Sequence, residues 1–255
     1  MFPKPTKTFV FTLAFLLSFS FNSFAEEKYT ANECFEKLSR GTLKFNMALD
    51  NAIFKPIAKG YRALPVPIRK GSSNFVENLR SLLTLSNNIL QGDFKGATNT
   101  AGRFVVNTTV GILGIFDPAS KIGLNNYDKE DYGQTLGAWG VSEGCYIVLP
   151  VLGPSTVRDT VASLASFSGG DAWYNITVRN NTQYVDDIDY YTSRVTAGVD
   201  FRAKNYDSIE NLEKNSLDFY ASVKSLYLQD RQQKILNSKK VINTQDDSDW
   251  EEIQN

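Results

Sequence analysis

The chain contains no histidine among its 255 residues and only two cysteines, Cys34 and Cys145. Without histidine it can form neither a Ser-His-Asp triad nor a histidine metal site. Two cysteines so far apart do not make a zinc motif. The phosphate-binding pattern G-x-x-x-x-G-K-S/T and the dinucleotide-binding pattern G-x-G-x-x-G are also absent. We therefore expect no catalytic residue, no cofactor and no metal ion, and a chain that is not an enzyme.

The chain also lacks an excess of charge of either sign. The chain has 27 basic and 28 acidic residues, which gives a net charge of −1. Nucleic-acid binding requires a concentrated basic face, because the phosphate backbone supplies most of the affinity. The composition therefore argues against a nucleic-acid partner.

The N-terminus has the pattern of a signal peptide. Lys4 and Lys7 precede an apolar run over residues 9–21, and Ala25 ends a small-x-small cleavage site. The run is shorter than the roughly 20 apolar residues that span a bilayer, although an uncleaved anchor is the alternative. Cys34 lies well past the apolar run and follows Glu33, which does not fit a lipid-attachment site. We predict a cleaved signal peptide over residues 1–25 and an exported, unlipidated mature protein.

Apolar spacing over most of the mature chain is helical. Residues 74–91 place their apolar side chains on one face of a 3.6-residue period. Gly71-Ser72-Ser73 supplies a start signal for this helix and Gly92 a stop signal. A second helix is expected to begin near Gly96, and another to be capped by Ser155 or Thr156. Further helices are predicted over residues 185–201, 208–213 and 217–236.

Two apolar segments do not fit this pattern. Residues 110–116 are apolar on all sides, so they must lie in a core or in lipid. Residues 146–152 have the composition of a strand, but Pro150 lacks a backbone donor and argues against a central strand. We interpret residues 146–152 as an extended connector or a membrane-dipping segment.

Four carboxylates flank apolar segments, where burial could raise a pKa enough for acid catalysis. They are Asp117, Asp131, Glu143 and Asp159. The interpretation that we prefer is that these acids cap helices, form turns or pair with Arg103 or Arg158. A secreted hydrolase that uses Asp117 or Glu143 stays open as an alternative function.

The cysteines and glycines each allow two structures. An exported protein with two cysteines can form one bridge, here across more than a hundred residues, worth about 4–5 kcal/mol in the chain-entropy model. Two separate buried thiols are the alternative. The spacings Gly133-x3-Gly137 and Gly140-x3-Gly144 can permit close helix contact or can belong to loops.

The end of the chain is acidic. Residues 245–255 contain five acids, no base and Trp250. This composition predicts a disordered, solvated tail, with a partner-docking peptide as the alternative. The expected organisation is a lead-in over residues 26–37, one helical domain over 38–236 and a disordered tail over 237–255.

Many ordered pieces of the chain resemble the MlaA (VacJ) family of outer-membrane phospholipid-transport proteins, over roughly residues 38–235. They include 103–111, 131–137, 153–159 and, late in the chain, 227–231. The residues that carry the resemblance are Asn46, Asp50, Pro56, Asn74, Asn78, Gln91, Gly92, Arg103, Asn107, Gly111, Asp117, Gly133, Gln134, Gly137, Pro150, Gly153, Arg158 and Asp159.

The resemblance implies an all-α single domain, a ring-like arrangement of amphipathic helices around a central amphipathic channel, set in the inner leaflet of the outer membrane. It implies that phospholipid mislocalised to the outer leaflet is passed to a periplasmic lipid carrier, with a trimeric porin as a second protein partner. A purely structural envelope adaptor is another alternative. The chain departs from the family in two ways: it lacks the lipid-attachment site, and Cys145 stands where the family usually has proline. The second departure favours a bridge to Cys34.

Overall fold

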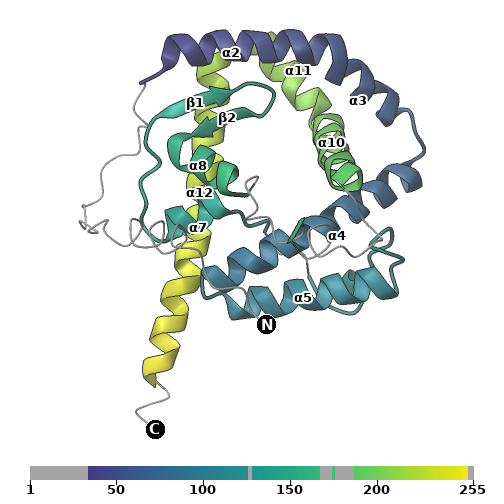
Figure 1. Ribbon diagram of the computed structural model, residues 1–255, viewed down its shortest axis with the longest axis vertical. Coiled ribbons are helices and arrows are strands. Elements are labelled where there is room, and N and C mark those ends of the chain that lie inside the picture. Colours follow the sequence, from purple (N-terminus) through teal and green to yellow (C-terminus); the bar gives the residue numbers. More distant parts are fainter. Residues whose placement is uncertain (1–33, 126–127, 167–173, 176–186, 252–255) are drawn as a thin grey trace, which may run out of the picture. The chain divides into compact units, whose positions relative to one another are not determined.

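The computed structural model of the protein describes residues 34–125, 128–166, 174–175 and 187–251, with side chains through residue 238 (Figure 1). All of these belong to one compact unit, Ala31–Asn255. The predicted signal peptide and most of the predicted lead-in lie outside the described residues.

The described part of the chain is mainly helical, which confirms the predicted fold class. The elements are α2 (Glu36–Leu49), the π-helical turn η1 (Asp50–Phe54), α3 (Lys55–Arg62), α4 (Val66–Leu90), α5 (Phe94–Thr109), α6 (Pro118–Lys121), α7 (Tyr132–Ala138), β1 (Tyr146–Leu149), β2 (Gly153–Thr156), α8 (Val157–Ala165), α10 (Asp187–Lys204), α11 (Tyr206–Asn215) and α12 (Phe219–Glu251).

Helix α4 begins eight residues earlier than the sequence pattern predicts. Proline in its first turn starts it, since the missing N–H would be unsatisfied there in any case. The expected start signal at residues 71–73 lies inside the helix instead. Gly71 packs closely there, since a Cβ would lie 3.1 Å from Cγ2 of Ile115. Gly92, with φ of 75°, ends the helix as predicted.

The apolar segment 110–116 is a turn rather than a helical piece. Ile112 and Leu113 have φ of 54° and 57°, a left-handed conformation that is costly for side chains with a Cβ. Backbone hydrogen bonds hold the turn, among them one from Gly114 N–H to the Asn107 carbonyl at 2.7 Å. Its apolar side chains point outward: Val110 is 71% exposed and Phe116 59% exposed. The sequence predicted that this segment lies in a core or in lipid, and the prediction of a core is therefore wrong.

The segment 146–152 contains a strand, so its interpretation as an extended connector is wrong. Strands β1 and β2 form an antiparallel hairpin in which Tyr146 opposes Thr156 and Leu149 opposes Gly153. Pro150 does not interrupt the strand because it lies in the connecting turn, where no ladder donor is required. Thr156 then caps α8, as expected, by accepting a hydrogen bond from Asp159 N–H at 3.2 Å.

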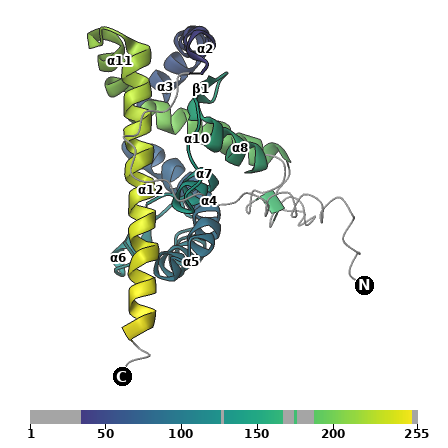
Figure 2. The ribbon, with the colours of Figure 1, turned by 90° about the vertical axis from the view of Figure 1, so that its left-hand side faces the viewer.

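Helix α12 extends to Glu251, whereas a disordered tail was expected from residue 237. No glycine or proline occurs in this part of the sequence to stop the helix. Figure 2 shows α12 from the side as one long helix that runs past α5 and α6 toward the C-terminus.

The elements contact one another in a closed circuit. Helix α2 packs on β1, β2 on α12, α12 on α7, α7 on α4, α4 on α10, and α10 on α3, which leads back to α2 through η1. The helix α5 packs along α4 on the outside of this circuit (Figure 1). The predicted ring-like arrangement therefore holds for the unit Ala31–Asn255.

The distribution of polar and apolar side chains is unlike that of an ordinary soluble domain. Among the described residues, buried polar and charged side chains outnumber buried apolar ones. The largest apolar cluster is small and centres on Tyr146, Val148 and Tyr220. Large apolar side chains are instead exposed on α2, α4, α5, α8 and α10. Exposed apolar surface of this extent marks contact with a membrane or a partner.

Candidate functional site: a polar cavity inside the helical ring

A cavity of about 320 Å³ lies inside the ring. Its wall is made by residues of α4, α7, α8, α10, α12 and the β-hairpin, which belong to the circuit of elements or, in the case of α8, pack against it. The side chains of the wall are both charged and apolar. The charged ones are Arg80, Asp131, Asp159, Arg194 and Arg231. We call this space the central cavity.

A buried charge network forms one wall of the central cavity. Arg231 of α12 bonds to Asp131 at 2.6 Å and to Asp159 at 3.0 Å. Asp159 also accepts a hydrogen bond from the Tyr227 hydroxyl at 2.6 Å and pairs with Arg158 at 3.0 Å. Two arginines and two aspartates therefore neutralise one another where α7, α8 and α12 meet.

The network determines the charge states of its members. Burial by itself would raise the pKa of Asp159, but the charge and hydrogen bond of Arg231, with Arg158 and Tyr227, hold it below its ordinary value. Burial is also the largest cause that raises the pKa of the Tyr227 hydroxyl, and the Asp159 charge adds to it. Asp159 is therefore ionised and Tyr227 protonated at neutral pH, and neither side chain is free to exchange a proton in this state.

The glycines of α7 make room for the network. A Cβ on Gly133 would lie 2.4 Å from Oδ1 of Asp159 and 2.6 Å from Nη2 of Arg231. A Cβ on Gly137 would lie 2.6 Å from Cδ1 of Ile235. The spacing Gly133-x3-Gly137 therefore permits close helix contact, which was one of its two interpretations. Gly140 and Gly144 lie outside helices with φ of 90° and 69°, so they are loop glycines.

Side-chain hydrogen bonds of glutamine residues join α7 to the end of α4. Asp131 caps α7 by accepting a hydrogen bond from Gln134 N–H at 2.9 Å. The Gln91 amide donates to the Thr135 hydroxyl at 2.9 Å, and Gln134 donates to Glu130 at 3.0 Å. Glu130 is largely surrounded by protein, and this desolvation raises the pKa of its carboxyl. Gln91 thus connects the end of α4 to α7 by hydrogen bonds to Thr135 and Glu130.

A second polar cavity, of about 330 Å³, lies between α4 and α5, and we call it the α4–α5 cavity. Arg103 of α5 reaches both carboxylate oxygens of Asp117 at 3.0 Å. Asn107 donates to Asp117 at 2.9 Å and accepts from Ala119 N–H at 3.1 Å. These contacts attach the start of α6 to α5 and form the end of the cavity.

The carboxylates considered for acid catalysis have structural partners. Burial favours a higher pKa for Asp117, but hydrogen bonds from Arg103 and Asn107 outweigh it and lower the pKa. Asp117 also caps α6, and Asp131 caps α7. Burial raises the pKa of Glu143, which lines neither cavity. Capping and pairing, the preferred interpretation, account for Asp117, Asp131 and Asp159.

Three residues of the resemblance lie near η1, where α2 turns into α3. Asn46 donates to the Leu149 carbonyl at 2.9 Å and accepts from Val151 N–H at 2.8 Å, so it holds both sides of the hairpin turn. Asp50 forms an ion pair with Arg202 of α10 at 2.8 Å. Pro56 lies in the first turn of α3.

Five further residues that carry the family resemblance stabilise turns. Asn78 donates to the Thr108 hydroxyl at 2.9 Å, and Asn74 donates to the Ile115 carbonyl at 3.2 Å. At Gly111 a Cβ would lie 2.4 Å from the Asn107 carbonyl oxygen. Gly153 has φ of 86° and ends the hairpin turn that Pro150 begins. These residues stabilise the apolar turn 110–116 and the hairpin and do not line the central cavity.

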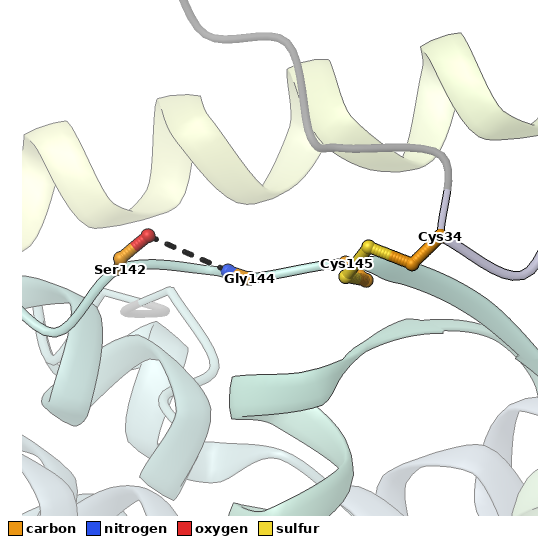
Figure 3. The surroundings of a disulfide bond; sticks show 4 residues. All are labelled: Cys34, Ser142, Gly144 and Cys145. Atoms are coloured by element: carbon orange, nitrogen blue, oxygen red, sulfur yellow. Dashed lines mark hydrogen bonds between the residues drawn. A yellow bond between two sulfur atoms is a disulfide. The ribbon is translucent and has the colours of Figure 1, made fainter.

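The two cysteines form a disulfide. Cys34 and Cys145 are bonded, with their Cα atoms 5.7 Å apart and a separation of 111 positions in sequence (Figure 3). The bond joins the segment before α2 to the residue before β1. Beside it, Gly144 N–H donates to the Ser142 hydroxyl at 3.5 Å. Of the two alternatives left open by the sequence, the structure has the bridge.

The comparisons with known proteins agree with this geometry. Residues 31–234 match the family described as MlaA lipoprotein. The chain belongs to the MlaA family. Two relatives are named intermembrane phospholipid transport system lipoprotein MlaA. The one from Haemophilus influenzae is 31% identical and covers 82% of each chain, and the one from Escherichia coli is 33% identical over 76% of this chain and 74% of its own.

A solved structure has the same fold. It belongs to work described as "Structural basis for maintenance of bacterial outer membrane lipid asymmetry". It superposes with a TM-score of 0.67 at 30% sequence identity, covering 80% of this chain and 99% of that one. At this level of identity the similarity extends beyond the general arrangement of helices, in agreement with membership of the MlaA family.

The residues that sequence reasoning missed are mainly basic. Arg231 was noted only as part of the piece 227–231, and Arg202, Arg80 and Arg194 were not considered as site residues. The sequence did contain a signal for Arg231. Asp131 and Asp159 are two acids in family pieces, and Arg158 can neutralise only one of them, so a second base was to be expected. Nothing in the local sequence distinguishes Arg80 from a surface arginine of an amphipathic helix.

Proposed function

We propose that this MlaA-family protein removes mislocalised phospholipid from the outer leaflet of the outer membrane and passes it to a periplasmic carrier, which maintains lipid asymmetry. The observation that carries the proposal is the combination of a polar cavity inside a ring of helices with large apolar side chains outside it. The relatives named for intermembrane phospholipid transport support the same conclusion.

The physical problem in such transport is that a phospholipid has two incompatible ends. Two acyl chains of about fifteen methylenes each cost roughly 24 kcal/mol to expose to water, at ~0.8 kcal/mol per methylene. The charged head group is costly to bring into hydrocarbon. A ring with a wet interior and an apolar exterior lets the head group move past Asp131, Asp159 and Arg231 while the tails stay near lipid.

Attachment to the periplasmic leaflet would rest on the exposed apolar surface. No described helix combines the length and apolar character that crossing a bilayer requires. The turn 110–116 instead presents Val110, Ile112, Leu113, Ile115 and Phe116 to the outside. Such a surface can enter the boundary between head groups and acyl chains. We propose that the protein is exported without a lipid anchor, since the sulfur of Cys34 is bonded to Cys145.

The proposed protein partners are a trimeric porin, which would hold the ring in the outer membrane, and a periplasmic lipid carrier, which would receive the lipid. Apolar side chains are exposed on α2, α8 and α10 as well as on the turn 110–116. This additional apolar surface is available for contact with a protein partner. We further propose that the protein acts without catalysis, because Asp117 and Asp159 are engaged by arginines.

The test is deletion of the gene followed by complementation with the wild-type chain. Deletion should raise the amount of phospholipid accessible to an external phospholipase and increase sensitivity to detergent. A variant with Val110, Leu113 and Phe116 all changed to Ser would test attachment, and it should restore neither property. Salt-washed outer membranes should retain the wild-type protein and lose this variant.

Two results would contradict the proposal. Deletion that leaves the lipid composition of the outer leaflet unchanged would argue for an envelope adaptor. Purified protein that cleaves lipid or glycan, and loses that activity on Glu143→Gln, would support the hydrolase. Glu143 is the appropriate residue because burial raises its pKa toward the range of a general acid.

A further inference from the structure

Arg80 lies at the junction of the two cavities. It projects from α4 and lines both the central cavity and the α4–α5 cavity, and no other residue lines both. Its side chain is exposed. A solute in either cavity can therefore reach this guanidinium.

Arg80 differs from the other cations of these walls in having no bonded partner. Arg231 pairs with Asp131 and Asp159, Arg103 with Asp117, and Lys129 with Glu77. Arg194 donates a hydrogen bond from Nη2 to the Tyr190 hydroxyl at 2.8 Å, and its guanidinium lies over the Tyr190 ring. Among the described residues, none forms a hydrogen bond or ion pair with Arg80.

The surroundings of Arg80 disfavour its own charge. Although the Arg80 side chain keeps access to solvent, the protein around it partly desolvates the guanidinium and lowers its pKa, and the positive charge of Arg194 lowers the pKa further. Asp131 and Glu77 oppose this effect only at longer range. Since an arginine remains protonated in proteins, the cavity wall holds a positive charge that has no bonded partner and lies near a second arginine. An anion would relieve both effects.

We propose that Arg80 binds the phosphate of a phospholipid head group as it passes between the two cavities. A guanidinium offers a planar fork of donors that matches two phosphate oxygens, and Arg194 adds a second positive charge nearby. Cavities of about 320 and 330 Å³ are at the lower end of small-molecule sites, a size for a head group rather than a whole lipid. The inference rests on the proposed transport function and assigns its head-group site.

The chemistry of the wall favours brief occupancy. Glu77 and Asp131 are near enough to affect Arg80 electrostatically but do not pair with it. They would repel a phosphate that advanced further into either cavity. A conduit must bind its cargo strongly enough to admit it and weakly enough to release it, and one arginine between two acids meets both conditions.

The experiment measures binding of two water-soluble lipids to the full mature protein by titration calorimetry. The probes are dihexanoylphosphatidylglycerol, which carries a phosphate, and dihexanoylglycerol, which does not. The variants are Arg80→Gln and Arg80→Lys. The matched control is Lys95→Gln, which removes one positive charge from an exposed position of α5 outside both cavities. Circular dichroism verifies that each variant is folded.

Arg80→Gln should weaken binding of the phospholipid about tenfold or more, the loss typical of a hydrogen bond to a charged group, and leave dihexanoylglycerol unchanged. Arg80→Lys should lose less, because it keeps the charge without the fork. Lys95→Gln should bind like the wild type. Equal phospholipid binding by Arg80→Gln and wild type, or an equal loss for both lipids, overturns the inference while the transport function stands.

Inorganic phosphate distinguishes the source of the anion. We expect it to compete with the phospholipid only at concentrations far above those of the lipid, because it makes no contact for the acyl chains. Competition by phosphate at equal concentration would overturn the assignment to a head group. A wild-type protein that binds neither lipid would overturn both this inference and the proposed function.

Discussion

Arg231 and Asp159 form a buried ion pair at 3.0 Å between α12 and α8, although 72 residues separate them in the chain. The side chains are 9% and 8% exposed, so both charges have left bulk water. Removing one member of such a pair leaves the other charge uncompensated, which is more damaging than removing both. This relationship underlies the first two predictions.

Arg231→Met should destabilise the protein by about 3 kcal/mol, since Asp159 keeps Arg158 and the Tyr227 hydroxyl but loses its buried ion pair with Arg231. Lys234→Met, one turn later on the same helix, breaks only the exposed pair with Asp230 and should cost less than about 0.5 kcal/mol. Urea unfolding followed by circular dichroism measures both. In the double variant with Asp159→Asn, the total loss should fall well below the sum of the two single losses; a simple sum would show that the residues act independently.

The pH dependence of stability should follow the Asp159 carboxyl. Its pKa in the folded protein lies below the unfolded value of about 3.9, so the unfolded chain binds more protons in this range. The contribution of Asp159 is present above that value and disappears as pH falls below about 4. Asp159→Asn should therefore reduce the fall of the unfolding free energy below about pH 4.

Glu143 provides a control of opposite sign for this pH dependence. Burial raises the pKa of its carboxyl, so its contribution is lost as pH rises above its unfolded value of about 4.3. Glu143→Gln should remove a decline on the neutral side and leave the acid side unchanged. A single pH profile shared by both variants would contradict the assignment of the two shifts.

Gly133→Ala should destabilise the protein by about 1–3 kcal/mol, because the new methyl group overlaps the contact between Asp159 and Arg231. Gly41→Ala is the matched control: it lies in α2, and a Cβ there would meet nothing within 4 Å. Alanine has the higher helix propensity, so this control should stabilise by about 0.5–1 kcal/mol. Thermal unfolding should show shifts in opposite directions. Two shifts of the same sign would mean that close packing at Gly133 is not limiting.

Reduction of the disulfide should lower stability by about 4–5 kcal/mol in the chain-entropy model, since the bond closes a loop of more than a hundred residues. The measurement is the midpoint of thermal unfolding with and without a reductant. A double variant, Cys34→Ser with Cys145→Ser, should unfold at the lower temperature in both conditions. A wild-type midpoint that does not respond to reductant, with both thiols titratable, would contradict this role of the bond.

Much of the local structure could be predicted from the sequence. Asp117 and Thr156 begin helices because a short polar side chain accepts a hydrogen bond from an N–H three residues later, an interaction contained within one turn. Gly92 ends α4 for an equally local reason. The errors arose where a local signal had two interpretations, as with Gly71 inside α4 and Pro150 at the hairpin turn.

The candidate site was predictable only in part. The family pieces already contained Asp159, Gly133 and Arg158, but their use as a charge network depends on Arg231. Arg80 could not be recognised at all, because an arginine on the polar face of a helix is ordinary. Its distinction is the lack of a partner, and that depends on where every other charged side chain lies.

The sequence alone determined the helical character of the protein, the absence of histidine chemistry and the neutral balance of charge, because these follow from composition and from interactions within a few residues. Only the tertiary structure decided that Cys34 meets Cys145, that Arg231 joins Asp131 and Asp159, and that the helices close around a polar cavity. These outcomes depend on contacts between residues 72 to 111 positions apart. No local pattern encodes such contacts, since they form only when the ring closes.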